Sequence, residues 1–276
     1  MSAFALPTDR PALMGILNVT PDSFSDGGHY LAAEKAIAAG RRMIEEGADL
    51  IDVGGESTRP GAEPVPADEE IGRTVPVIEA LAGDGIPISI DTMKPEVARR
   101  GLGAGAFLIN DVGGMRDPAM VDVALGSNCH VCIMHMQGEP RTMQAAPNYG
   151  DVVREVRRFL VLQAVMLEEA GVAPERIWLD PGIGFGKTLE HNLLLLRHLD
   201  QLVATGYPVL VGVSRKSFLG KLTDNAPADD RLEGTLAAQV LAQSLGARVI
   251  RAHDVKAARR AIDVGTAILN GVCAEA

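Results

Sequence analysis

Residues 33–54 read AEKAIAAGRRMIEEGADLIDVG, and this stretch contains the unit from which the fold can be inferred. Residues 33–46 are rich in alanine, glutamate and arginine and predict a helix, and Gly47 stands just past its end, where glycine is favoured. The short apolar run 50–54 predicts a strand, and a polar residue, Asp52, lies within it. A helix, a glycine and a buried strand with a polar residue near its end therefore form one unit.

The same alternation runs along the whole chain. Strands are predicted at 12–19, 50–54, 87–91, 107–111, 130–135, 177–180, 208–213 and 248–253. Helical segments between them include 33–46, 95–103, 152–170 and 233–245. Alternating strands and helices predict a parallel sheet, and near-continuous apolar strands indicate one that is buried on both faces. We expect an α/β chain folded as a single-domain (β/α)8 TIM barrel over residues 1–276, with 1–10 as an N-terminal extension. A doubly wound open sheet is the alternative.

Composition excludes several classes of function. The chain has 276 residues, 47% of them hydrophobic, and a net charge of -10, which argues against nucleic-acid and anionic-membrane partners. No apolar run is long enough to span a bilayer, and the start, MSAFALPTDRPALMG, lacks the features of a signal peptide. Three cysteines, an odd number, suggest a reducing compartment, so we expect a cytoplasmic protein.

Polar side chains stand at the end of every predicted strand. They are Asn18, Asp52, Asp91, Asn110, Asp111, His135, Asp180, Ser214, Arg215, Lys216, Arg251 and His253. One such residue is often only a turn former, and Asp111 fits that reading. Polar groups at all eight ends indicate an active site at the C-terminal ends of the strands, where barrel enzymes place their chemistry.

These residue types point to two kinds of ligand. Asp91, Asn110 and Asp180 offer acceptor oxygens that suit a flat heterocycle with a donor-rich edge. Arg215, Lys216, Arg251 and His253 follow the seventh and eighth strands, where barrels commonly bind phosphate. Asn18 adds a neutral oxygen, a ligand suited to Mg²⁺ beside a substrate phosphate.

Other patterns carry less weight. The run 182–188, GIGFGKT, lacks the first glycine of a Walker A loop because Pro181 occupies that position, so we expect a flexible loop that carries Phe185. Cys129 and Cys132 have a redox or zinc spacing, but they lie in or beside a strand and are expected to be inert, buried thiols. His191 and His198 are expected to be surface residues.

The chain resembles the bacterial dihydropteroate synthases in motifs that occur in family order across nearly its whole length. The motifs are NVTPDSFSDGG at 18–28, DVGGESTRPG at 52–61, IDT at 90–92, IND at 109–111, MHMQG at 134–138, LDPGIGFGK at 179–187, SRKSF at 214–218 and RAHDV at 251–255. The resemblance implies a Mg²⁺-dependent, SN1-like condensation of 7,8-dihydropterin-6-ylmethyl diphosphate with 4-aminobenzoate. The products would be 7,8-dihydropteroate and pyrophosphate.

The resemblance also implies roles for individual residues. The pterin would be held by Asp91, Asn110, Met134, Asp180 and Lys216. The diphosphate would be bound by Asn18, Arg251 and His253, with Asn18 also at the metal. The 4-aminobenzoate site would comprise Phe24, Thr58, Arg59, Pro60, Phe185, Lys216 and Ser217. Catalysis would depend on Asp52, Asp91, Lys216, Arg251 and His253, with Asp52 near the cationic carbon.

Two rival functions remain open on sequence alone. One is a pterin-binding methyltransferase domain of the corrinoid type, which would have no diphosphate to expel. The other is a paralogue that binds a pterin without turning it over. For the favoured reading, the resemblance further implies sulfonamide inhibitors at the aminobenzoate site and a homodimer.

Overall fold

Eight parallel strands form the centre of the computed structural model, which describes residues 4–20, 28–57, 61–139 and 141–271. The strands are β1 (Ala12–Asn18), β2 (Leu50–Gly54), β3 (Ile88–Asp91), β4 (Leu108–Asp111), β5 (His130–Met134), β6 (Ile177–Asp180), β7 (Leu210–Val211) and β8 (Val249–Ala252). They lie in the order β6-β5-β4-β3-β2-β1-β8-β7. A parallel bridge between Leu179 and Val209 joins the two ends of this order. The sheet therefore closes into a barrel, and the open-sheet alternative is wrong.

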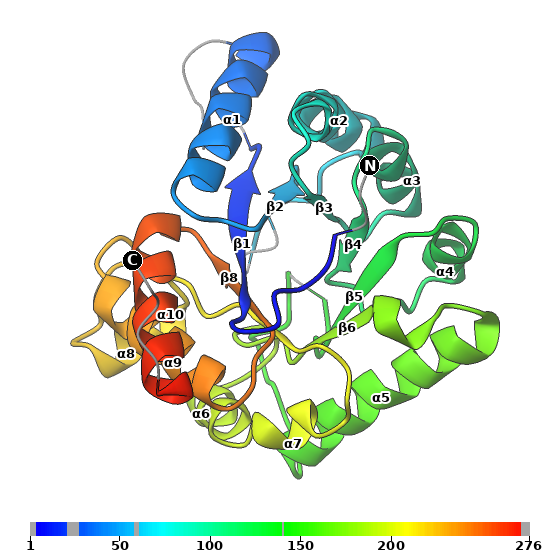
Figure 1. Ribbon diagram of the computed structural model, residues 1–276. Helices are drawn as coiled ribbons and strands as arrows, with labels where there is room; N and C mark the ends of the chain where they lie inside the picture. The colour runs from blue at the N-terminus through cyan, green and yellow to red at the C-terminus, as the bar shows by residue number, and fades with distance from the viewer. Residues whose placement is uncertain (1–3, 21–27, 58–60, 140, 272–276) are drawn as a thin grey trace.

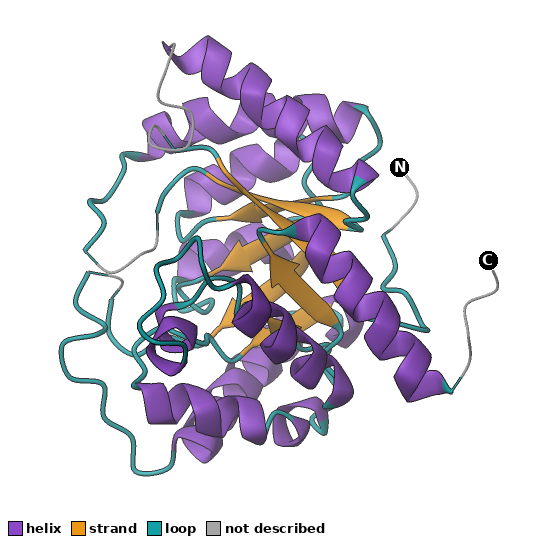
Figure 2. Ribbon diagram, turned by 90° about the vertical axis from the view of Figure 1, so that its left-hand side faces the viewer, coloured by secondary structure: helices purple, strands orange, loops and turns teal. Residues whose placement is uncertain are grey.

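Helices surround the strands on all sides (Figure 1). They are α1 (Gly28–Glu45), α2 (Ala67–Gly83), α3 (Pro95–Gly103), α4 (Pro118–Leu125), α5 (Val152–Ala170), the 3-10 turn η2 (Pro174–Arg176), α6 (Leu189–Arg197), α7 (Asp200–Val203), α8 (Ser217–Leu222), α9 (Leu232–Ser244) and α10 (Val255–Asn270). Figure 2 shows long loops on one side of the barrel and both termini on the other. None of the helices that the structure describes has the length and apolar character of a membrane span.

The element limits follow from local chemistry. Gly47 and Gly171, just past α1 and α5, adopt positive φ angles of 103° and 114°, which glycine tolerates best. Pro95 begins α3, where its missing N–H is not needed. The seventh strand starts later than its predicted range of 208–213, and Pro208 at that start has no N–H to give to the sheet.

Alternate strand residues fill the barrel or face the helices. The inward-facing apolar set is Ala12, Met14, Leu50, Leu108, Cys132, Trp178, Leu210 and Val249, all buried. Phe4, from the N-terminal segment, packs against Phe107 with ring centroids 4.9 Å apart, and Phe107 contacts Trp178. These rings close the floor of the barrel, so the polar ends of the strands form its only described mouth.

Candidate active site

Strand register brings the predicted residues to the same end of the barrel. Asp91 on β3 lies opposite Asn110 on β4, and Met134 on β5 lies opposite Asp180 on β6. Asp52 lies two residues before Gly54, which is the register partner of Asp91. Residues far apart in the sequence therefore meet at the mouth because parallel strands end together.

One guanidinium is shared between two carboxylates there. Arg251 Nε donates to Asp52 Oδ2 at 2.6 Å, and its Nη2 donates to Asp91 Oδ2 at 2.8 Å. The amide of Asn110 also donates to Asp52 Oδ2, at 3.0 Å. Asp52 is fully buried. Three of the predicted catalytic residues, Asp52, Asp91 and Arg251, thus form one continuous hydrogen-bonded network with Asn110.

This network leaves two acceptor atoms without a partner. Asp52 Oδ1 and Asp91 Oδ1 are buried and accept no hydrogen bond from any residue that the structure describes. A buried acceptor without a donor costs roughly 1–3 kcal/mol. Ligand N–H groups, or positive charge on a ligand, would offset that cost.

Burial and charge shift the ionisation of the group. Burial, together with the charge of Asp52, raises the pKa of Asp91 to about 7 despite the nearby Arg251. Burial alone would lower the pKa of Arg251, but the two carboxylates raise it above its ordinary value, so this side chain stays charged. The mouth therefore combines a permanent cation with a carboxylate that titrates near neutral pH.

The neighbouring strand ends form a second cluster. Asp180 is buried, its Oδ1 accepts the backbone N–H of Gly182 at 2.7 Å, and burial raises its pKa. The ammonium of Lys216 lies 3.9 Å from the ring centroid of Phe185, a cation–π contact, and burial lowers the pKa of Lys216 to about 8. Phe185 packs on an apolar group that includes the buried Met134. A carboxylate, an ammonium, a thioether and a ring thus lie close together after β5, β6 and β7.

Residues after β7 and β8 form the third part of the mouth. The Nδ1 atom of His253 lies 3.0 Å from Ser214 Oγ, which fixes the imidazole beside β8. Arg215, in contrast, pairs with Asp254 through two bonds of 3.0 and 2.5 Å and is exposed. Arg215 thus lies exposed at the rim in an ion pair, and its grouping with the phosphate-binding residues stays a prediction.

The remaining predicted residues are only partly placed. Asn18 ends β1 and is half-buried, and Ser217 is exposed at the first position of α8. Phe24, Thr58, Arg59 and Pro60 lie outside the described residues. Their assignment to an aminobenzoate site stays a prediction.

The loop after β6 differs from expectation. We expected residues 182–188 to be flexible, but backbone and side-chain bonds hold them. Tyr149 donates to the carbonyl of Gly186 at 2.8 Å, and the N–H of Gly184 donates to Asn192 at 2.6 Å. Gly182, Gly184 and Gly186 all have positive φ angles, between 58° and 85°. The glycines allow the backbone to follow a tight, fixed path with positive φ angles, and the loop is not flexible.

Two buried charged groups were missed by the sequence analysis. Lys187 is 3% exposed and contacts His135 and the Phe185 carbonyl. Glu70, fully buried on α2, pairs with Lys94 at 2.5 Å, and Lys94 also pairs with Glu56. Nothing in the local pattern marks Lys187 or Glu70 as buried, because partners from other elements, His135 and Lys94, help to satisfy their charges.

The lesser motifs fall largely as expected. Cys129 and Cys132 are buried free thiols that belong to different apolar clusters. His191 caps α6 by exchanging hydrogen bonds with Thr188, and His198 ends that helix. In the described ranges there is no group of three or more His, Cys, Asp or Glu side chains that could hold a metal ion together.

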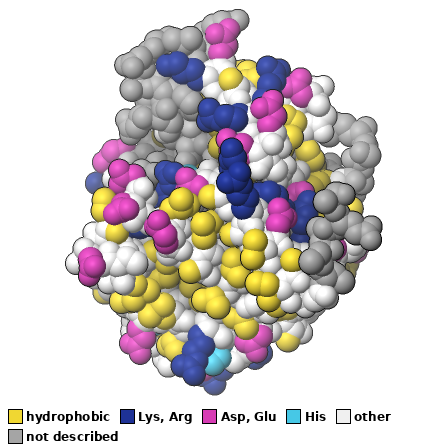
Figure 3. All heavy atoms as spheres, turned by 60° about the vertical axis from the view of Figure 1, so that its left-hand side comes forward, with side chains coloured by type: hydrophobic (Ala, Val, Ile, Leu, Met, Phe, Trp, Pro, Cys, Tyr) yellow, Lys and Arg dark blue, Asp and Glu magenta, His cyan; other side chains and the backbone are white. Residues whose placement is uncertain are grey.

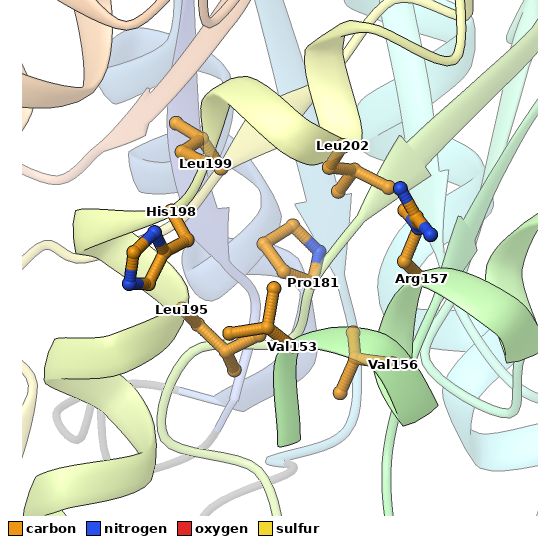
Figure 4. A pocket seen from close by; sticks show the side chains of 8 residues that line it. All are labelled: Val153, Val156, Arg157, Pro181, Leu195, His198, Leu199 and Leu202. Carbon is orange, nitrogen blue, oxygen red and sulfur yellow. The ribbon is translucent and has the colours of Figure 1, made fainter. Parts of the chain in front are cut away.

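A small hollow lies away from the mouth, between α5 and the segments α6 and α7 (Figure 4). Its volume is about 10 Å³, room for about one water molecule. It is lined by Val153, Val156, Arg157, Pro181, Leu195, His198, Leu199 and Leu202. A hollow of this size cannot hold a substrate.

Comparison with known proteins agrees with this geometry. Residues 14–253 match the family model described as pterin binding enzyme. Buried carboxylates at the mouth of a closed barrel thus define a pterin-binding barrel protein.

Similar proteins of known identity show which pterin-binding family the chain belongs to. The chain is 48% identical to the dihydropteroate synthase of Escherichia coli (strain K12), over 96% of this chain and 94% of that protein. It is 48% identical to the enzyme of Neisseria meningitidis serogroup C, over 96% and 95%. The solved Yersinia pestis dihydropteroate synthase with a sulfonamide drug complex superimposes with a TM-score of 0.92, at 45% identity and 98% coverage of both chains. The chain belongs to the dihydropteroate synthase family.

Proposed function

We propose that this protein is a transferase that condenses 7,8-dihydropterin-6-ylmethyl diphosphate with 4-aminobenzoate. The products are 7,8-dihydropteroate and pyrophosphate, so the transfer is of an alkyl or aryl group other than methyl, within folate biosynthesis. The observation that carries the proposal is the network in which Arg251 joins Asp52 and Asp91 at the barrel mouth. It provides an anion-binding cation and carboxylate acceptors side by side.

The carboxylates suit the pterin. Asp180 and Asp91 would accept the N–H donors of the ring edge, and Asn110 and Lys216 would bond its remaining polar atoms. Met134 would pack on the ring face, since it lies opposite Asp180 in the register. The solved enzyme of Xanthomonas albilineans in complex with 7,8-dihydropteroate, 46% identical over 95% of both chains with a TM-score of 0.87, supports a pterin in such a mouth.

The cations suit the leaving group. In the proposed step the bond between the exocyclic carbon and the diphosphate oxygen breaks, and its electron pair leaves with the diphosphate. Arg251 and His253 would stabilise the negative charge that develops there. The carboxylate of Asp52, whose Oδ1 has no partner in the described part of the chain, would stabilise the cationic carbon. The aniline nitrogen then forms the new C–N bond and loses a proton.

Mg²⁺ is part of the proposal. No hydrogen bond joins the Asn18 side chain to another residue in the described ranges, so its amide oxygen remains available. A single protein oxygen fits Mg²⁺, which usually keeps several waters and is bound largely through substrate phosphates. When bound, the ion would neutralise the charge of the diphosphate.

The second substrate would lie against Phe185, Lys216 and Ser217. The proposed site also includes Phe24, Thr58, Arg59 and Pro60, from segments outside the described residues. The solved Thermus thermophilus enzyme in complex with 4-aminobenzoate supports the choice of substrate, at 47% identity, a TM-score of 0.86 and coverage of 96% of this chain and 97% of that one. The Yersinia pestis complex supports sulfonamides as inhibitors.

We extend the proposal to a homodimer in the cytoplasm. Hydrophobic side chains gather on the face that α9 and α10 form (Figure 3). Leu241, Val264 and Ile268 there are 65%, 61% and 74% exposed. A second copy of the chain would cover this surface. The two free, buried thiols favour a reducing compartment.

Pyrophosphate release tests the activity. The enzyme should release pyrophosphate and form dihydropteroate in equal amounts when both substrates and Mg²⁺ are present, and excess chelator should stop the reaction. A corrinoid-type methyltransferase domain or a non-catalytic pterin-binding paralogue would release none. Full activity in excess chelator would contradict the proposed role of Mg²⁺ and leave the proposed reaction standing.

A further inference from the structure

The ammonium of Lys187 is fully used inside the protein. Its Nζ atom lies 3.0 Å from His135 Nδ1, 3.2 Å from the His135 carbonyl oxygen and 2.9 Å from the Phe185 carbonyl oxygen. An ammonium has three protons, and these contacts account for all of them. Because Lys187 is also 3% exposed, it has neither a free proton nor the access needed to bind substrate.

The partners of Lys187 belong to two segments. His135 directly follows β5, whereas Phe185 lies in the loop after β6. The lysine therefore ties that loop to the neighbouring strand end. Holding a buried ammonium with neutral acceptors is costly, and burial lowers the pKa of Lys187 to about 7. Such a cost is expected where fixed geometry is required.

The tie acts on the peptide that carries Phe185. The Phe185 N–H donates to the Gly182 carbonyl at 3.0 Å, and its own carbonyl is held by Lys187. With both backbone groups fixed, the ring lies beneath the Lys216 ammonium at 3.9 Å. Displacing the peptide would move the ring and remove the cation–π contact.

We infer that Lys187 is a positioning residue for the second substrate, acting through Phe185 and Lys216. The inference rests on the proposed function and adds a residue to it. Other bonds hold the rest of the loop, from Tyr149 to Gly186 and between Gly184 and Asn192. Loss of the lysine should therefore loosen the Phe185 peptide and leave the loop in place.

A double-mutant cycle tests the inference. In Lys187→Met, the KM for 4-aminobenzoate should rise about tenfold, as expected for loss of a charged hydrogen bond, while the Kd for the pterin diphosphate changes less than about threefold. In Phe185→Leu the same KM should rise, and adding Lys187→Met should raise it little further, since both changes act through one ring. Tyr149→Phe, which loses only the Gly186 bond, should change the KM less than about threefold.

Two results would overturn the inference. One is a double variant whose KM rises by the product of the two single effects. The other is a Lys187→Met enzyme that loses pterin and aminobenzoate affinity equally, as a general disruption of the site would produce. If Lys187→Met does not fold, Lys187→Gln, which keeps two N–H donors without the charge, should show the same pattern with smaller changes.

A measurement without substrate separates this inference from the proposed activity. Hydrogen exchange at the Phe185 amide should be at least about tenfold faster in Lys187→Met, or in Lys187→Gln, than in Tyr149→Phe, because opening of this peptide is what the tie prevents. Unchanged exchange would refute the positioning role even in an active enzyme. If the wild-type protein releases no pyrophosphate, the proposed activity is refuted. The hydrogen-exchange result would still test whether Lys187 holds the Phe185 peptide in place.

Discussion

Arg251 couples the two halves of the candidate site. In the described structure it forms ion pairs with both Asp52 and Asp91. A diphosphate that draws on this cation would leave those carboxylates less well compensated, at a cost that pterin N–H donors and a developing carbocation would offset. We therefore expect the pterin and diphosphate parts of one substrate to bind cooperatively.

Asp180→Asn tests the pterin assignment. The new amide oxygen can keep the bond from the Gly182 N–H, which turns the NH₂ group toward the pterin donors. A charged hydrogen bond is lost and two donors face each other, at a cost of roughly 1.5–3 kcal/mol or more. Affinity for the pterin diphosphate should fall at least about tenfold. Unchanged binding by calorimetry in a folded variant would remove Asp180 from the pterin site.

Pterin affinity should depend on pH through Asp91. Its pKa is raised to about 7, so below pH 7 the carboxyl is mostly protonated and a poorer acceptor. Binding that requires the ionised form must then release a proton, and affinity should fall up to about tenfold per pH unit below 7. Calorimetry from about pH 5.5 to about pH 8.5 with a pterin that lacks phosphate measures this effect. Asp91→Asn should abolish the fall in affinity below pH 7. A wild-type affinity that does not change between about pH 5.5 and about pH 7 would contradict the assignment.

At the scale of the element, the sequence predicts the strands better than the contacts among their side chains. All eight strands and their polar ends follow from apolar runs with helices between them. The pairing of Asp52 with Arg251, 199 residues away, depends on closure of the barrel, which no local pattern records. The burial of Lys187 could not be predicted for the same reason, since its partner His135, just after β5, cannot be read from the loop that carries the lysine.

Gly182→Ala tests whether the β6 loop follows a fixed path. A Cβ atom there would lie 1.9 Å from the His135 carbonyl oxygen, at a φ of +64°. We expect a loss of stability of at least about 3 kcal/mol and loss of pterin binding. Gly206→Ala is the matched control, because its φ is +89° and no atom lies within 4 Å of the added carbon. It should cost only about 1–2 kcal/mol. Equal melting temperatures for the two variants would show that the loop yields freely.

At the scale of the whole molecule, closure of the barrel and the aromatic floor leave one described mouth for all ligands. The apolar face on α9 and α10 lies on the outside of the barrel. Ile268→Glu should therefore weaken a homodimer by placing charge on that face. Sedimentation should show dimeric wild type and a shift toward monomer in the variant. Glu190→Gln, on α6, is a surface control that should remain dimeric. If the Ile268→Glu variant is as dimeric as the wild type, this face is not the dimer interface.

The central claim is that one mouth has a pterin end at Asp180 and a diphosphate end at Arg251. Calorimetry with Mg²⁺-pyrophosphate and with a pterin that lacks phosphate, on Arg251→Ala and Asp180→Asn, tests it most directly. Arg251→Ala should lose at least about tenfold in pyrophosphate affinity and a clearly smaller factor in pterin affinity, which it affects only through Asp91, and Asp180→Asn should show the reverse. Equal losses of both ligands in both variants would contradict the division of the site.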